Sequence, residues 1–136
     1  MTYARYKMCI FGDGGVGKTT LVNRFISGKY SEDFKMTIGV DFYTKNIEID
    51  GIKVNLQICD FAGEHQFKRL LPNYVIGASG GIFMYDISRF YSLIHFEDWY
   101  VFEAIHLIPC VDNFLFQNRI RSPIPGFQFF FFADNL

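Results

Sequence analysis

The sequence predicts an α/β fold with a mostly parallel sheet and one antiparallel edge strand. Short apolar runs that end at glycine or proline alternate with segments of helical periodicity, which is typical of a parallel sheet covered by helices. Two runs of alternating polarity, 46–50 and 53–59, are joined through Asp50-Gly51, and this predicts a β-hairpin. A hairpin inside a β/α order places one antiparallel strand at the edge of the sheet.

The chain has 136 residues, which fits one domain over 1–136, and neither a linker nor an internal repeat suggests a second. Half of the residues are hydrophobic and 20% are charged, as in a globular domain. The formal net charge of -1 argues against a general nucleic-acid binder, which needs a basic surplus. We therefore expect no nucleic-acid partner.

Cysteine usage and hydropathy predict a cytoplasmic protein. Cys9, Cys59 and Cys110 lack the spacing of a zinc site or disulfide framework, so we expect reduced thiols. No run of about 18 apolar residues predicts a membrane-spanning helix, and the N-terminus is too short and polar for a secretory signal. The terminal "FFADNL" has no cysteine for prenylation, so we expect no intrinsic membrane anchor.

The first elements in chain order are a strand over 6–11 and a helix that begins near Lys18. The strand is apolar and ends at Gly12, and the helix is expected to end at Gly28. The apolar residues of this helix recur at i,i+4 spacing: Leu21 with Phe25 and Val22 with Ile26.

The later elements are less regular. Segment 67–80 has a helical pattern that Pro72 and the glycines interrupt, and 81–87 is typical of a buried strand. A helix over 92–108, ended by Pro109, would place Leu93, Phe96, Tyr100, Ala104 and Leu107 on one face. From 111 to 136 the pattern degrades, and "FQFFFF" (127–132) fits either a buried strand or an exposed adhesive segment.

A glycine-rich loop between the first strand and helix satisfies the pattern G-x-x-x-x-G-K-[ST] with Gly12, Gly17, Lys18 and Thr19. Such a loop turns backbone N–H groups toward the phosphates, and the helix N-terminus, the lysine and a Mg²⁺-binding hydroxyl add to it. The alternative is a chance glycine-rich turn. The strand before and the helix after it favour a nucleoside triphosphate site, without indicating the base.

Two further stretches refine this hypothesis. Thr37 lies in a polar loop, and Asp60 ends a strand with Gly63 three residues later. A carboxylate at a strand end can hold Mg²⁺, and a glycine N–H can approach a γ-phosphate without a side chain in the way.

Together, Gly12–Thr20, "TIGVDF", "DFAGE" and "YDIS" resemble the Ras superfamily of small GTPases, and the Rab branch most closely. The resemblance covers about residues 6–100 and implies a P-loop NTPase three-layer fold, while leaving open whether the last strand and helix are present. It implies a molecular switch of signal transduction that hydrolyses GTP to GDP with Mg²⁺. It also implies effector, exchange and activating proteins at two switch regions, 31–41 and 60–77.

The site residues implied by the resemblance fall into three groups. Nucleotide-binding residues are Gly14, Gly15, Val16, Gly17, Lys18, Thr19, Thr20, Phe34, Thr37, Asp60 and Gly63. Mg²⁺ ligands are Thr19, Thr37 and Asp60, and the catalytic group is Glu64, Lys18 and Thr37. Phe34 occupies a position where the family usually has a tyrosine.

Glu64 departs from the family, which has a glutamine at this position to orient the attacking water. A carboxylate adds negative charge beside the nucleotide, so we expect slow intrinsic hydrolysis unless His65, Gln66 or a partner assists. The rival hypothesis is a switch that binds nucleotide without turnover.

The base-reading Asn-Lys-x-Asp element of the family is also absent from the sequence. Three explanations remain: a truncated or frame-shifted product, a divergent base site, or a shortened protein completed by a partner. A GTPase fragment without guanine selectivity and an ATP-using P-loop protein are therefore further alternatives.

Other polar and aromatic residues have ordinary interpretations. We expect His95 and His106 to be satisfied or solvent-facing, Asp86 to be a structural acid at a strand end, and Trp99 to pack in the core.

Overall fold

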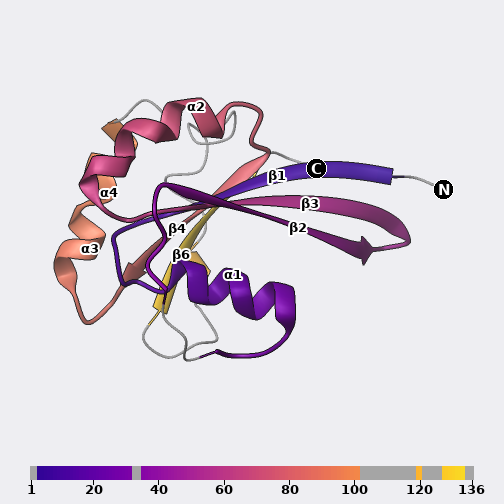
Figure 1. The fold of residues 1–136 in the computed structure, drawn as a ribbon, viewed down its shortest axis with the longest axis horizontal. Helices are drawn as coiled ribbons and strands as arrows, with labels where there is room; N and C mark the ends of the chain where they lie inside the picture. The colour runs from indigo at the N-terminus through magenta and orange to yellow at the C-terminus, as the bar shows by residue number, and fades with distance from the viewer. Residues whose placement is uncertain (1–2, 32–34, 102–118, 121–126, 134–136) are drawn as a thin grey trace.

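The computed structural model describes residues 3–31, 35–101, 119–120 and 127–133, which form one six-stranded sheet with helices on both faces (Figure 1). The strands are β1 (Tyr3–Phe11), β2 (Val40–Ile49), β3 (Ile52–Phe61), β4 (Gly80–Asp86), β5 (Arg119–Ile120) and β6 (Phe127–Ala133). The helices are α1 (Lys18–Ser27), the 3-10 helix η1 (His65–Leu70), α2 (Leu71–Val75), α3 (Phe90–Ile94) and α4 (Phe96–Val101).

The strand order β2-β3-β1-β4-β6-β5 confirms the α/β fold. β1 pairs in parallel with β3 and β4, and β2 is the predicted antiparallel edge strand beside β3. The expectation of a single antiparallel neighbour was wrong, because β6 also pairs antiparallel with β4 along 80–86. The aromatic run 127–132 is thus a strand, and it pairs with β5 on its other side.

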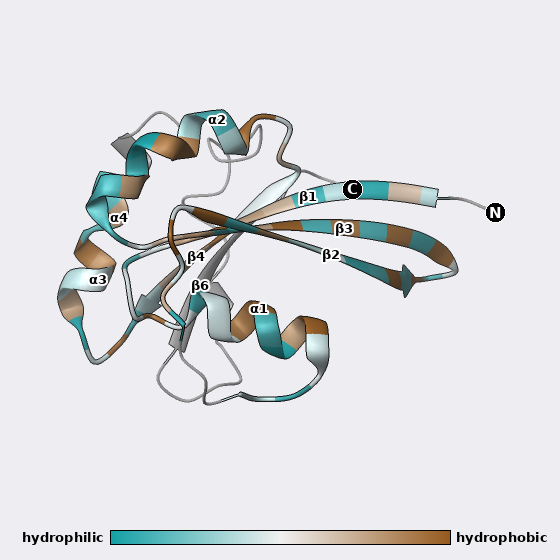
Figure 2. Ribbon diagram, viewed as in Figure 1, coloured by the Kyte–Doolittle hydropathy of each residue, from teal (hydrophilic) through white to brown (hydrophobic). Residues whose placement is uncertain are grey.

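Two hydrophobic cores lie on opposite faces of the sheet because side chains alternate along each strand. On β1, Cys9 and Phe11 point into one core, whereas Ile10 points into the other. α1 covers the Ile10 face, and α2, α3 and α4 cover the opposite face (Figure 1). The same alternation appears as brown and teal bands along β3 in Figure 2. This arrangement is the predicted three-layer fold.

Tight turns and helix ends follow the predicted glycines. Asp50 and Gly51 have φ angles of 50° and 77°, the left-handed conformations that a two-residue hairpin turn requires. Gly28 ends α1 with φ 72° and donates its N–H to the carbonyl of Arg24. Both predictions are confirmed.

The two later helices differ from the prediction. Pro72 does not interrupt a helix; it lies in the first turn of α2, where its missing N–H costs no intrahelical bond. Segment 92–101 is divided into α3 and α4 at His95, so the predicted continuous helix is wrong there, and 102–108 lies outside the described residues.

Cys9 and Cys59 are buried free cysteines that stand opposite each other on β1 and β3, as expected for thiols in strands. Cys110 and His106 lie outside the described residues. Among the helices of the described residues, none has both the length and the apolar character needed to cross a membrane.

Candidate nucleotide-binding site

The glycine-rich loop leaves the end of β1 through backbone conformations that favour glycine. Gly12, Gly15 and Gly17 have φ angles of 137°, 74° and 93°. At Gly12 the neighbouring strand also excludes a side chain, because a Cβ there would lie 2.1 Å from the carbonyl oxygen of Met84 on β4. The loop therefore packs directly on the central sheet.

We expect Gly12→Ala to destabilise the fold by about 3 kcal/mol or more, because the clash is with backbone and φ is unfavourable. Thermal or urea unfolding measures this loss. Gly28→Ala is the matched control, since Gly28 also has a positive φ but nothing lies within 4 Å of the added Cβ. An equal loss in both variants would show that the close approach to Met84 contributes nothing.

Lys18 begins α1 and is almost fully buried behind the loop, at 5% exposure. Its Nζ donates to the carbonyl oxygens of Gly12 and Asp13, each at 2.7 Å. Burial lowers the pKa of Lys18 to about 8, although the nearby acidic groups, Asp60 foremost, favour the charged form. The ammonium group is therefore held at a fixed point of the loop.

Three oxygen-bearing side chains from separate segments meet beside this lysine. Thr19 Oγ1 lies 2.6 Å from Thr37 Oγ1 and donates to Asp60 Oδ2 at 2.5 Å. Desolvation raises the pKa of Asp60, and its Oδ1 is buried without a hydrogen-bond partner among the described residues. An unpartnered carboxylate oxygen beside two hydroxyls fits the oxygen ligands that Mg²⁺ prefers.

The segment after β3 packs against the phosphate loop. A Cβ on Gly63 would lie 2.0 Å from Gly14 N, so only glycine fits this contact. The next residue, Glu64, points its carboxylate toward the same loop, with Oε1 3.6 Å from a Cβ built on Gly14. Glu64 Oε2 is buried and has no hydrogen-bond partner among the described residues.

A cavity of about 950 Å³ opens in front of the loop. Most of the predicted site residues line it: Gly14, Gly15, Gly17, Lys18, Thr19, Thr20, Thr37, Gly63 and Glu64. Asp60 reaches the site through Thr19, whereas the Val16 side chain is fully buried in the α1-side core and leaves only its backbone for a ligand. Phe34 lies outside the described residues.

Sequence reasoning missed several residues that also line this cavity: Leu21, Arg24, Tyr30, Lys35, Met36 and Met84. The basic residues Arg24 and Lys35 follow the loop in the sequence, and their charge close after a phosphate motif was an available signal. Met84 comes from β4, and only the sheet topology brings it to the site.

The sequence matches the family model of the Ras family over residues 7–116. The chain belongs to the Ras family. The match extends beyond residue 100, where the resemblance read from motifs ends.

Curated relatives place this Ras-family chain in the Rab branch. Ras-related protein RABG3b of Arabidopsis thaliana is 40% identical over 94 residues, which cover 69% of this chain and 46% of the relative. Ypt/Rab-type GTPase YPT7 of Saccharomyces cerevisiae is 36% identical over 118 residues, 86% of this chain and 51% of the relative. The chain spans about half the length of the curated relatives it matches.

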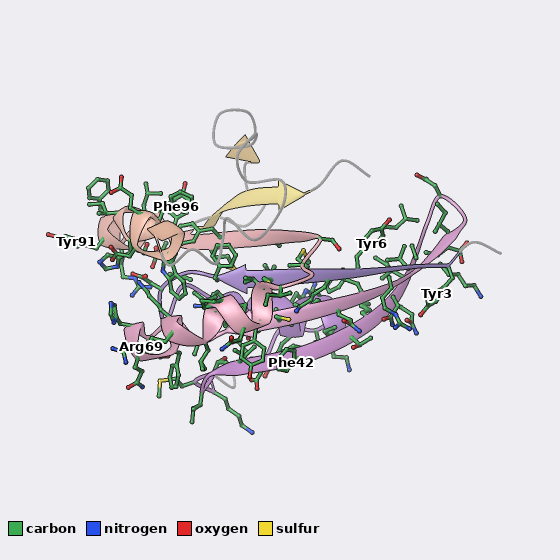
Figure 3. The ribbon with its side chains drawn as sticks, turned by 90° about the horizontal axis from the view of Figure 1, so that it is seen from above. Tyr3, Tyr6, Phe42, Arg69, Tyr91 and Phe96 are labelled. Atoms are coloured by element: carbon green, nitrogen blue, oxygen red, sulfur yellow. The ribbon has the colours of Figure 1, made fainter. Side chains whose placement is uncertain are left out.

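On the outer side of its phosphate loop, this Ras-family chain has a second set of contacts. His95 Nδ1 lies 2.5 Å from Asp13 Oδ2, and Trp99 Nε1 donates to Asp13 Oδ1 at 3.2 Å. His95 is thus satisfied and Trp99, fully buried, packs in the core, as predicted. Phe96, labelled in Figure 3, lies between these two residues in the sequence, and its ring packs edge-on against that of Phe83 with the centroids 4.9 Å apart.

Arg89 completes the outer contacts. Its Nη2 donates to the carbonyl oxygen of Gly14 at 3.0 Å, and its Nε donates to Asp86 Oδ2 at 3.2 Å. Asp86 Oδ1 accepts from the N–H and hydroxyl of Ser88, which lowers the pKa of Asp86 and confirms its role as a structural acid. Arg89, His95 and Asp13 line a smaller cavity of about 240 Å³, which shares Gly14 and Gly63 with the lining of the large one.

Proposed function

We propose that the chain is a guanine-nucleotide-dependent switch that binds GTP and GDP with Mg²⁺ and hydrolyses GTP slowly. The observation that carries the proposal is the meeting of Thr19, Thr37 and Asp60 around one point beside Lys18. These groups come from the helix, the polar loop and the end of β3. Membership in the Ras family supports guanine as the base.

In this proposal the loop binds phosphates and the oxygen cluster holds the metal. Backbone N–H groups from Gly14 to Thr19 and the ammonium of Lys18 bind phosphate oxygens. Thr19 and Thr37 hydroxyls and the Asp60 carboxylate would hold Mg²⁺, which neutralises charge on the phosphate oxygens when bound. Thr20 adds a hydroxyl to the same wall of the cavity.

Glu64 would face the water that attacks the γ-phosphate. Its carboxylate can accept a proton from water, but it brings negative charge into a site that already holds a polyphosphate. Lys18 opposes that charge, and Thr37 fixes the polar loop over the cavity. Slow GTP hydrolysis is expected because the group that orients the water, the Glu64 carboxylate, is negatively charged.

The switch regions 31–41 and 60–77 are the proposed surface for effector, exchange and activating proteins. Ala62 N–H donates to the carbonyl of Gly39 at 2.8 Å, so the two segments are tied together. Phe42, labelled in Figure 3, lies beside Tyr74 of α2 with ring centroids 5.5 Å apart. Exposed apolar residues within the two segments, Met36, Ile38 and Ile76, support a protein-binding surface.

The test of the proposal is a titration of the protein with GDP, GTP and ATP, with and without Mg²⁺. Tight, guanine-selective and Mg²⁺-dependent binding is the expected result. Weak binding without base preference would instead identify a GTPase fragment that retains only the phosphate half of the site. Preference for ATP would overturn the assignment of the base.

The second candidate, a switch that binds nucleotide without hydrolysing it, is favoured by the carboxylate of Glu64, whose buried Oε2 has no hydrogen-bond partner in the part of the chain that the structure describes. We expect Glu64→Gln to raise single-turnover hydrolysis of bound GTP by about tenfold, because a neutral amide can orient water without added charge. Glu48→Gln, an exposed change on β2, is the control. Release of phosphate by neither wild type nor Glu64→Gln would favour the binding-only switch.

A further inference from the structure

The carbonyl groups of the phosphate loop change direction between Asp13 and Gly14. The carbonyls of Gly12 and Asp13 both accept from Lys18 Nζ, which lies on the wall of the large cavity. The carbonyl of Gly14 accepts instead from Arg89, which lines the smaller cavity on the outer side and not the large one. The carbonyl of Gly14 is therefore turned toward Arg89 and away from the large cavity.

This reversal determines where the next N–H group points. The described residues contain no cis peptide bonds, and in a trans peptide the C=O and the following N–H point in opposite directions. An outward carbonyl at Gly14 thus turns the N–H of Gly15 inward, toward the large cavity that Gly15 lines. The left-handed φ of 74° at Gly15 allows this turn of the chain.

We propose that Arg89 is a positioning residue that holds the Gly14–Gly15 peptide so that the Gly15 N–H faces the phosphates. The inference rests on the proposed function and deepens it, because it assigns a role to a residue outside the cavity. Arg89 acts through the peptide, because it is not among the residues that line the large cavity.

Arg89 is itself fixed by two bonds from one planar group. Its Nε bonds Asp86 while its Nη2 bonds Gly14, and Ser88 holds Asp86 in place. The rigid fork of a guanidinium can make both contacts at once, whereas the single nitrogen of lysine cannot reproduce that geometry. The loop is thus tied to the end of β4 through a charged hydrogen bond.

The expected signature is a dependence on the β-phosphate. Inward N–H groups of a P-loop surround the β-phosphate, so a mispositioned Gly15 weakens binding of a diphosphate and leaves a monophosphate unaffected. A residue with a merely structural role would change the affinity for both nucleotides by the same factor.

The test uses the full chain and measures GDP and GMP affinities by competition. We expect Arg89→Ala to weaken GDP binding about five- to tenfold and to leave the GMP affinity unchanged. The hydrogen bond from Arg89 to the Gly14 carbonyl is charge-assisted, but the Arg89 side chain is half exposed, so its loss has a moderate effect. Arg89→Gln keeps an amide NH₂ group that can donate to the Gly14 carbonyl, so it should lose less affinity. Arg5→Ala, an exposed arginine on β1, is the matched control for loss of one positive charge.

Unchanged GDP affinity in Arg89→Ala, or an equal loss for GDP and GMP, would overturn the positioning role while the proposed function stands. A wild-type protein that binds no GDP would contradict the proposed function and this role with it. If thermal unfolding shows that Arg89→Ala does not fold, the ratio of GDP to GMP affinity in Arg89→Gln and Arg89→Lys tests the positioning role in its place.

Discussion

Replacing Lys18 with alanine should weaken GDP and GTP binding by about 100-fold or more, because the variant loses charge-assisted hydrogen bonds to phosphate oxygens. Lys18 is the buried cation of the cavity wall, and the structure holds its ammonium group against two loop carbonyls. Isothermal titration, or displacement of a fluorescent GDP analogue, measures the loss.

Two variants separate this effect from damage to the fold. Lys18→Met keeps the length of the side chain and removes its charge, so it should lose as much affinity as Lys18→Ala. Lys29→Ala removes an exposed lysine just beyond α1 and should bind like wild type. Wild-type affinity in Lys18→Met would contradict the assignment of Lys18 to the phosphates.

The second large effect concerns the metal. We expect Asp60→Asn to weaken Mg²⁺ binding by about 10- to 100-fold, because an amide replaces the carboxylate of the oxygen cluster. The gain in nucleotide affinity that Mg²⁺ gives the wild type should shrink by a similar factor. Titration of the GDP complex with Mg²⁺ in the presence of a chelating buffer measures both.

Asp60→Asn should fold as well as the wild type. Burial raises the pKa of Asp60, so its charge is unfavourable in the folded protein and a neutral amide removes that cost. Asp50→Asn makes the same change of charge in the hairpin turn, where asparagine tolerates the positive φ. An Mg²⁺ affinity that is equally reduced in both variants would point to overall charge instead of the oxygen cluster.

The sequence predicts the parts of this protein that depend on local pattern. The hairpin at Asp50-Gly51 and the end of α1 at Gly28 follow from the conformations that glycine permits. Thr19 and Asp60 could be selected because oxygen ligands at the start of a helix and the end of a strand converge in a parallel sheet. Thr37, which lies in a loop, was selected only through the resemblance to the Ras superfamily. For each of these local patterns, few other conformations are compatible with the residues present.

The parts that escaped prediction depend on contacts between distant segments. The antiparallel pairing of β6 with β4 cannot be read from an apolar run, because such a run has no direction. His95 divides the predicted helix where its ring meets Asp13, which is 82 positions earlier in the chain. Arg89 likewise looks like an ordinary loop residue until the fold brings it to Gly14.

The contact between Gly14 and Gly63 makes the two glycines unequal in the variation they can tolerate. A methyl group on Gly14 would meet the Glu64 carboxylate at an ordinary distance of 3.6 Å, whereas a methyl group on Gly63 would overlap backbone atoms of the loop. In a library of variants selected for folding alone, alanine should therefore be recovered at position 14 and be depleted at position 63. Substitutions can therefore accumulate over evolution at Gly14 in the loop, but not at Gly63.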